Sequence, residues 1–162
     1  MFQQPKKAWD TIVQPILKRP AYLQFSALCF RQRKGETEVL LITSRGTGRW
    51  IMPKGWPISG LSGAETARQE AWEEAGVKKA TIYQHSLGRF SYIKRLDNEV
   101  DTPCEADVYA IRVDKLIDSY PERKMRKRRW VTPKQAAKMV QEPGLKKILR
   151  DFDPAKLKRT KS

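Results

Sequence analysis

The stretch GWPISGLSGAETARQEAWEEAGV, residues 55–77, carries the most informative pattern in the chain. It spaces Glu70, Glu73 and Glu74 three and four positions apart, so that a helix places them on one face. Like charges at that spacing repel one another, and the cluster becomes favourable when a hard divalent cation such as Mg²⁺ binds the carboxylate oxygens. A solvated acidic face without a ligand is the alternative interpretation of this helix taken alone.

The ends of this helix are also marked in the sequence. Ser62 and Glu65 have the Ser-x-x-Glu spacing of a capping box, in which side chain and backbone cap each other. Gly76 stands where a left-handed C-terminal cap belongs. The sequence therefore predicts a helix over residues 63–75.

A loop that contains Gly, Pro and cations precedes the helix. Its sequence is RWIMPKGWP at residues 49–57, and Arg49 and Lys54 supply the positive charges. Cations and backbone amides bind phosphoryl oxygens, while a metal ion neutralises charge and activates water. The loop and the helix together indicate a site for a phosphorylated substrate.

This segment resembles the Nudix box, whose pattern is Gly, five residues, Glu, seven residues, Arg-Glu, an aliphatic residue, any residue, Glu-Glu, any residue, Gly and an aliphatic residue. The positions in register are Gly55, Glu70, Glu73, Glu74, Gly76 and Val77, with Ala71 at the first aliphatic position.

Two positions of the box depart from the pattern. Leu61 stands where the box has its first Glu, and Gln69 stands where it has Arg. Because both charged residues of the box are replaced together, no charge is left without its partner. We expect Glu65 and Arg68 to replace them in part as an i, i+3 pair. The box is interpreted as active, with a catalytically silent relative as the alternative.

The resemblance extends over about residues 20–150. It is closest to the branch that includes diphosphoinositol polyphosphate and diadenosine polyphosphate hydrolases. Two further segments carry it: LLITSR at 40–45, which leads into the box, and PERKMRKRRWV at 121–131, which precedes a helical pattern. The resemblance implies an α+β fold, namely a Nudix α/β/α sandwich with a mixed β-sheet between helices.

The expected organisation is a single Nudix domain with short flanking segments. The domain covers residues 20–152, after an N-terminal extension of residues 1–19 and before a basic C-terminal tail of residues 153–162. Partial alternation predicts strands at 23–31, 39–44, 80–85, 89–94, 106–113 and 127–131. Further helices are predicted at 133–141 and 144–151, and a turn at 97–99.

The resemblance implies that Glu70, Glu73 and Glu74 are the catalytic and metal-binding residues. They would bind Mg²⁺, with Mn²⁺ as an alternative, and a box carboxylate would help to deprotonate water. Glu105 is a weaker candidate for that base. The predicted substrate-binding residues are Arg45, Arg49, Lys54, Gly55, Arg126 and Arg128. Strand alternation places Arg126, Arg128 and Trp130 on one face.

The charge of the chain agrees with an anionic substrate. Its 162 residues carry 33 Lys and Arg against 18 Asp and Glu, a formal net charge of +15. An excess of this size attracts phosphorylated small molecules or nucleic acid, and the attraction weakens as salt rises. A phosphorylated small molecule is the favoured partner, and a nucleic acid is the less favoured one.

The remaining features limit the location of the protein. No apolar run reaches the roughly 18 residues of a membrane span, and the N-terminus lacks a signal-peptide core. Cys29 and Cys104 lack metal-ligand spacing and lie in apolar runs, which favours buried, reduced thiols. We expect a cytoplasmic protein.

The predicted function is Mg²⁺-dependent hydrolysis of phosphoanhydride bonds in highly phosphorylated small molecules. Diphosphoinositol polyphosphates and diadenosine or nucleoside polyphosphates both fit. Trp50, Trp56 and Trp72 offer stacking for a nucleobase, although such residues are more often part of a core. The alternatives are a non-catalytic basic module that binds RNA or polyphosphate, and a pyrophosphohydrolase acting on RNA 5′ ends.

Overall fold

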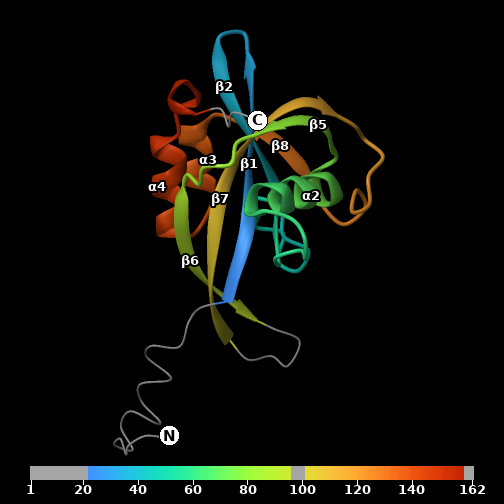
Figure 1. Ribbon diagram of the computed structural model, residues 1–162, viewed down its shortest axis with the longest axis vertical. Coiled ribbons are helices and arrows are strands. Elements are labelled where there is room, and N and C mark those ends of the chain that lie inside the picture. The colour runs from blue at the N-terminus through green and yellow to red at the C-terminus, as the bar shows by residue number, and fades with distance from the viewer. Residues whose placement is uncertain (1–21, 96–100, 159–162) are drawn as a thin grey trace, which may run out of the picture.

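A mixed β-sheet forms the centre of the molecule (Figure 1). The computed structural model describes residues 22–95 and 101–158, so the predicted N-terminal extension and the turn at 97–99 lie outside the described residues. The strands are β1 (Tyr22–Arg33), β2 (Glu36–Thr43), β3 (Trp50–Ile51), β4 (Lys54–Gly55), β5 (Val77–Ile82), β6 (Gly88–Arg95), β7 (Asp101–Leu116) and β8 (Arg128–Val131).

The order of the strands explains why the sheet is mixed. The main path runs β3-β2-β1-β7-β5, while β4 pairs with β1, β6 with β7 and β8 with β2. Strands β1 and β7 are parallel, and the other described pairings are antiparallel. The long strands β1 and β7 therefore hold together segments that are far apart in the sequence.

A tight hairpin joins β1 to β2. Its two turn residues, Lys34 and Gly35, have φ angles of 52° and 80°. A two-residue hairpin of this kind needs positive φ at both turn positions, which glycine adopts without strain. Because the turn is this short, β1 ends later than the predicted run 23–31, and β2 begins earlier than the predicted run 39–44.

Two other strand predictions differ clearly from the structure in their bounds, and two short strands were not predicted. The strand predicted at 80–85 begins earlier, because Val77 is buried and pairs with Leu116 at the end of β7. The strand predicted at 106–113 is much longer, since its first half pairs with β6. The two-residue strands β3 and β4 are too short to produce a periodic pattern, and the sequence did not reveal them.

Helices cover both faces of the sheet (Figure 1). Helix α2 (Gly63–Ala75) lies on one face, and α3 (Pro133–Met139) and α4 (Pro143–Asp151) lie on the other. A short 3₁₀ turn, η2 (Pro154–Lys156), follows α4. The predicted α+β sandwich with a mixed sheet between helices is confirmed.

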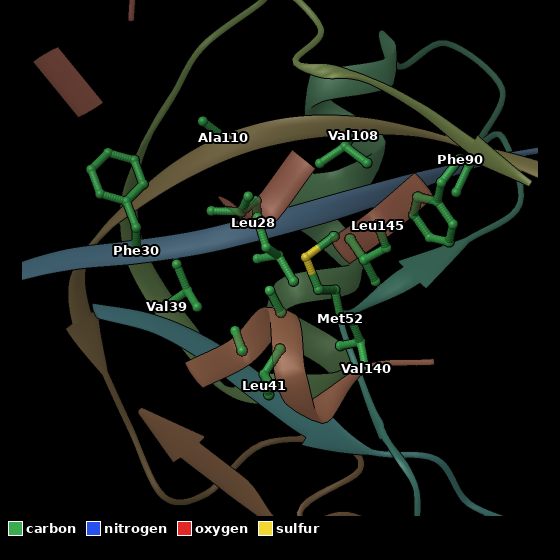
Figure 2. Close-up of a cluster of buried hydrophobic side chains, with 14 of the residues drawn as sticks. Leu28, Phe30, Val39, Leu41, Met52, Phe90, Val108, Ala110, Val140 and Leu145 are labelled. Atoms are coloured by element: carbon green, nitrogen blue, oxygen red, sulfur yellow. The ribbon is translucent and has the colours of Figure 1, made fainter. Parts of the chain in front are cut away.

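The two faces of the sheet carry separate hydrophobic clusters. On the side of α3 and α4, the buried residues include Leu28, Phe30, Leu41, Leu145 and Leu149. Figure 2 shows part of this cluster, with large side chains from the strands and helices pointing toward one another. The cluster under α2 contains Ala67, Ala71 and Ala75 from the helix, together with strand residues that include Cys29. Cys29 and Cys104 are buried free thiols, as predicted.

Candidate active site

Helix α2 has the bounds and caps that the sequence predicts. The Ser62 hydroxyl accepts a hydrogen bond from the Glu65 backbone N–H at 3.1 Å, and the Glu65 carboxylate accepts one from the Ser62 N–H at 2.8 Å. Gly76 closes the helix with φ 76°. These local contacts fix where the helix starts and ends, and hence which side chains it turns toward the sheet.

Small side chains let α2 approach the sheet closely. Its inner face is formed by alanines with no exposed surface: Ala64, Ala67, Ala71 and Ala75. At the same time, the Glu70 side chain lies against Gly55 on β4. A Cβ atom at Gly55 would stand only 2.3 Å from the Glu70 carboxyl carbon. A side chain at position 55 would therefore displace the Glu70 carboxyl group.

Two carboxyl groups of α2 meet at this point. Glu70 and Glu74 share a hydrogen bond between their side chains. Burial raises the pKa of Glu74 to about 8, and the Arg126 guanidinium opposes this shift. Burial also raises the pKa of Glu70. Two carboxylates this close repel each other, and a bound cation relieves that repulsion.

Positive and polar groups surround Glu74. The Lys54 backbone N–H lies 3.4 Å from Glu74 Oε1, and Arg126 Nη2 lies 3.7 Å from the same oxygen. Arg126 also donates to Glu122 at 2.9 Å and to the Thr43 carbonyl at 3.0 Å. Arg126 is almost fully buried, and these contacts fix its guanidinium beside the carboxyl pair.

Glu73 faces a different partner. Its carboxylate accepts a hydrogen bond from the Gln69 side-chain amide at 2.7 Å. Gln69 occupies the position where the Nudix box has Arg. The residue that departs from the pattern therefore hydrogen-bonds directly to one of the three box carboxylates. In residues 22–95 and 101–158, no three acidic, histidine or cysteine side chains already form a group that could hold a metal ion.

The residues expected to replace the missing charged pair act separately. Glu65 caps the N-terminus of α2, as described above. Arg68 donates to the backbone carbonyls of Val77 at 2.8 Å and Lys78 at 2.9 Å, and so ties the helix to β5. The two side chains stabilise opposite ends of α2, each with its own partner.

A cleft of about 700 Å³ opens beside the Glu70–Glu74 pair. Seven of the residues predicted for the site line it: Arg45, Arg49, Lys54, Gly55, Glu70, Glu74 and Arg126. The cleft is open to solvent on the side of Gly46 and Trp56, which are exposed lining residues. It brings anion-binding cations and cation-binding carboxylates to one place.

Two of the cations in the cleft are held by neighbours. Arg49 Nη1 forms an ion pair with the nearly buried Glu142 at 2.9 Å. Glu142 stands at the N-cap of α4, so this contact joins the cleft to the opposite helical layer. The Lys54 ammonium lies 5.1 Å from the centre of the Tyr92 ring. Burial lowers the pKa of Lys54 to about 8, while the charge of Glu74 raises it.

Arg128 lies elsewhere. It donates to the carbonyls of Ala75 at 2.9 Å and Ile117 at 2.8 Å, and to Asp118 at 2.7 Å. Like Arg126, it reaches toward α2, as strand alternation predicts. Arg128 stabilises the C-terminal end of the helix, whereas Arg126 reaches the carboxyl pair.

Some cleft residues were not identified from the sequence. They are Gln24 on β1, Tyr92 and Lys94 on β6, and Glu122 in the segment after β7. Their position depends on the register of β1 and β6 against β7, in which Tyr22 and Tyr92 both pair with Cys104. No local pattern encodes that register. Glu105, the alternative base, is half-buried on β7, and its Oε1 lies 3.7 Å from Arg89 Nη1.

The donor set of the cleft fits a hard divalent cation. Glu70 and Glu74 offer carboxylate oxygens, the ligands that Mg²⁺ prefers. The two carboxyl groups lie close enough for a bound cation to relieve their mutual repulsion. The Glu70 carboxyl group occupies space beside Gly55 that a larger residue at position 55 would fill. Glu73 would have to leave Gln69 to contribute.

A family model described as NUDIX domain matches residues 23–152 of the chain. The chain belongs to the Nudix family. Its α2 is the helix of the Nudix box, and the match covers the sheet and the helices on both faces.

Named relatives of this Nudix chain include plant and animal proteins. Nudix hydrolase 12, mitochondrial, of Arabidopsis thaliana is 30% identical over 118 residues, which are 71% of this chain and 58% of that protein. Diphosphoinositol polyphosphate phosphohydrolase 3-alpha of Homo sapiens is 30% identical over 118 residues, covering 72% and 67%. The chain spans 53% to 63% of the length of five Arabidopsis relatives.

Solved structures share the fold. A C. elegans Ap4A hydrolase in a binary complex superposes with a TM-score of 0.63 at 19% identity, covering 80% of this Nudix chain and 93% of the other. The NUDIX domain of Shewanella oneidensis NrtR complexed with ADP ribose gives 0.60 at 15% identity, covering 93% and 98%. In the part of the chain that the structure describes, no helix is long and apolar enough to cross a membrane.

Proposed function

We propose that the protein hydrolyses phosphoanhydride bonds in highly phosphorylated small molecules with the aid of Mg²⁺, or alternatively Mn²⁺. The observation that carries this proposal is the pairing of the half-buried Glu70 with the buried Glu74 in one cleft with several cations. A metal-assisted phosphoryl site contains carboxylates that bind the metal ion and cationic side chains that bind the phosphate oxygens.

The carboxylates would hold the metal. Glu70 and Glu74 face the cleft, and Glu73 is the third candidate ligand, next to Glu74 on α2. When bound, the ion neutralises phosphate charge and lowers the pKa of a water molecule. The chain itself would contribute a box carboxylate to accept a proton from the attacking water. Gly55 leaves space in the cleft wall for the Glu70 carboxyl group.

The cations would bind and orient the phosphates. Arg45, Arg49, Lys54 and Arg126 line the cleft, with Gly55 beneath Glu70. Arg49 and Arg126 are already held by Glu142 and Glu122, so the cost of ordering them on binding is small. Arg128, in contrast, has its donors engaged at the end of α2, and we assign it a structural role.

The substrate class rests on charge and on the relatives. One relative is named a diphosphoinositol polyphosphate phosphohydrolase, and one structural neighbour is an Ap4A hydrolase. Both names fit an anionic phosphorylated small molecule as the partner of this chain, with its net charge of +15. The cytoplasmic location stays a prediction, and some relatives are named mitochondrial.

The decisive experiment measures Mg²⁺-dependent phosphate release. Wild type, Glu74→Gln and Glu105→Gln are compared on diadenosine polyphosphates, diphosphoinositol polyphosphates, ADP-ribose and 5′-triphosphate RNA. Glu74→Gln removes a metal ligand and should lower the rate by more than about a hundredfold. Removing a group that only orients a metal ligand costs up to about a hundredfold. Glu105→Gln should keep full activity, because Glu105 lies outside the cleft lining and is paired with Arg89. Activity that survives Glu74→Gln contradicts the proposal.

A second candidate function is a non-catalytic module that binds RNA or polyphosphate. The contact between Gln69 and Glu73 favours it, because it directs one box carboxylate away from its neighbours. Such a module would bind its ligand without a divalent metal, its affinity would fall steeply with salt, and Glu74→Gln would have little effect. Turnover of the 5′-triphosphate RNA alone would instead favour an RNA-end pyrophosphohydrolase.

A further inference from the structure

Exposed hydrophobic side chains gather at the mouth of the cleft. Trp56 and Ile93 line it, and each is strongly exposed. The ring of Tyr22, itself 53% exposed, meets the Trp56 ring edge to face, with 6.0 Å between ring centroids. Met125, also exposed, lies 4.0 Å from Arg45 at the sulfur atom. An apolar rim beside a charged cleft marks a ligand-binding surface.

Trp56 differs from the two other tryptophans considered as stacking residues. Trp50 is partly buried and packs against the core on the side of α3 and α4. Trp72 is half-buried on α2, outside the cleft lining, with the Lys78 ammonium 5.2 Å from its ring centre. Trp56 is 42% exposed and lines the cleft. The core does not account for its position.

The geometry of the Trp56–Tyr22 pair leaves a stacking surface. The two ring planes are inclined at 85°, so Tyr22 can cover at most one face of the Trp56 indole. At least one indole face is therefore left uncovered by Tyr22. An aromatic face of this kind attracts a second planar ring, and stacking of a nucleobase on an aromatic side chain contributes about 1–3 kcal/mol.

We infer that Trp56, supported by Tyr22 and flanked by Ile93, is a platform for the nucleobase of a nucleotide substrate. Trp56 follows Gly55, the residue against which the Glu70 carboxyl group lies. A nucleotide can thus stack its base at the rim while its phosphates reach the cations of the cleft. This inference rests on the proposed function and narrows it to nucleoside polyphosphates, since a base-free inositol polyphosphate gains nothing from an indole face.

The test compares two ligands that differ only in the base. AMP and ribose 5-phosphate are titrated by NMR, in EDTA, against wild type, Trp56→Ala, Trp56→Gln and Trp56→Phe. Both non-aromatic variants should weaken AMP binding about tenfold and leave ribose 5-phosphate unchanged. Trp56→Phe should retain most of the affinity for AMP, because the phenyl ring still offers a face. Leu61→Ala is the matched control, an exposed apolar residue outside the cleft lining.

Turnover gives an independent readout. With the non-aromatic variants, KM for a diadenosine polyphosphate should rise about tenfold, while the kinetics on a diphosphoinositol polyphosphate should not change. Equal losses for AMP and ribose 5-phosphate, or AMP binding that is insensitive to Trp56, overturn the inference. Thermal unfolding of each variant confirms that it is folded.

The two proposals fail separately. AMP binding that depends on Trp56, with no hydrolysis of any substrate, supports the platform and contradicts the hydrolase. Hydrolysis of base-free substrates with no effect of Trp56→Ala supports the hydrolase and contradicts the platform.

Discussion

The two faces of the sheet are covered by helices that meet it in different ways. On one face, α4 contributes the large buried side chains Leu145 and Leu149, while α3 contributes Ala136 and Ala137. On the other face, α2 presents alanines and comes close to the strands. The first arrangement buries much apolar surface, which stabilises the fold. The second places carboxyl groups against β4, where the cleft begins.

Stability and chemistry are thus assigned to different layers of the molecule. Large core residues supply most of the burial free energy, whereas alanine supplies little. A layer of alanines therefore contributes mainly geometry, because it brings the α2 backbone near the sheet. Substitutions on the two faces should accordingly separate folding from activity.

The largest expected effect is on the face of α3 and α4. Leu149 is fully buried, and Leu149→Ala leaves a cavity in the cluster shown in part in Figure 2. It should lower the free energy of unfolding by about 2–5 kcal/mol. Denaturant titration measures this loss. The rate per folded molecule should not change, and a large fall in kcat in the folded variant would break the division between the two layers.

The reverse behaviour is expected at Gly55. In Gly55→Ala the new methyl group meets the Glu70 carboxyl group, the movable end of a side chain, so the fold should persist. A displaced carboxylate should lower the rate roughly a hundredfold, the cost of a misplacement near 1 Å. Steady-state kinetics measures it. Gly46→Ala is the matched control, because Gly46 also lines the cleft but has open space around its Cβ position.

The carboxyl pair makes the stability of the metal-free protein depend on pH. Burial raises the pKa of Glu74 from 4.5 to about 8, so the folded protein holds that proton more tightly than the unfolded chain. The stabilisation is complete below about pH 4.5 and is lost as the pH rises through 8. In EDTA, Tm should fall by on the order of 5 °C between pH 5 and 8.

Two comparisons sharpen this result. Glu74→Gln should flatten the pH dependence, because the amide does not titrate. Added Mg²⁺ should raise Tm of the wild type most at pH 8, where a metal does not compete with the proton. A wild-type Tm that rises over this range in EDTA would contradict the pH argument.

The smallest effect is expected where the two layers touch. Glu142→Gln keeps a hydrogen bond to Arg49 but removes the charge from that contact. Because charge-assisted hydrogen bonds are about twice as strong as neutral ones, KM should rise about fivefold with little change in kcat. Kinetics on the best substrate measures this. An unchanged KM would mean that Arg49 needs no support from α4.

The parts predicted from the sequence are those that local signals encode. The bounds of α2 follow from Ser62, Glu65 and Gly76, whose capping contacts involve near neighbours in the chain. Strand alternation predicts a shared face for Arg126 and Arg128; Arg126 precedes β8, yet both arginines reach α2. How far each arginine reaches does not follow from alternation, because that depends on where α2 ends relative to β8.

Other features depend on contacts that no local pattern encodes. Tyr92 and Gln24 enter the cleft through the register of β6 and β1 against β7. The hydrogen bond from Gln69 to Glu73 depends on the rotamers of these two side chains on one helix surface, which the sequence does not specify. The exposure of Trp56 could not be separated from burial, since a tryptophan beside a strand is compatible with either.

The parallel pairing of β1 with β7 has a consequence for how the chain folds. Tyr22 pairs with Cys104 and Phe30 with Arg112, so partners are separated by roughly eighty residues. During synthesis on the ribosome, the β1–β2 hairpin emerges well before β7. Until β7 is available, the long edge of β1 that pairs with it stays unpaired. Folding should therefore be slow for a chain of this length, and the nascent hairpin is the segment that most needs protection from aggregation.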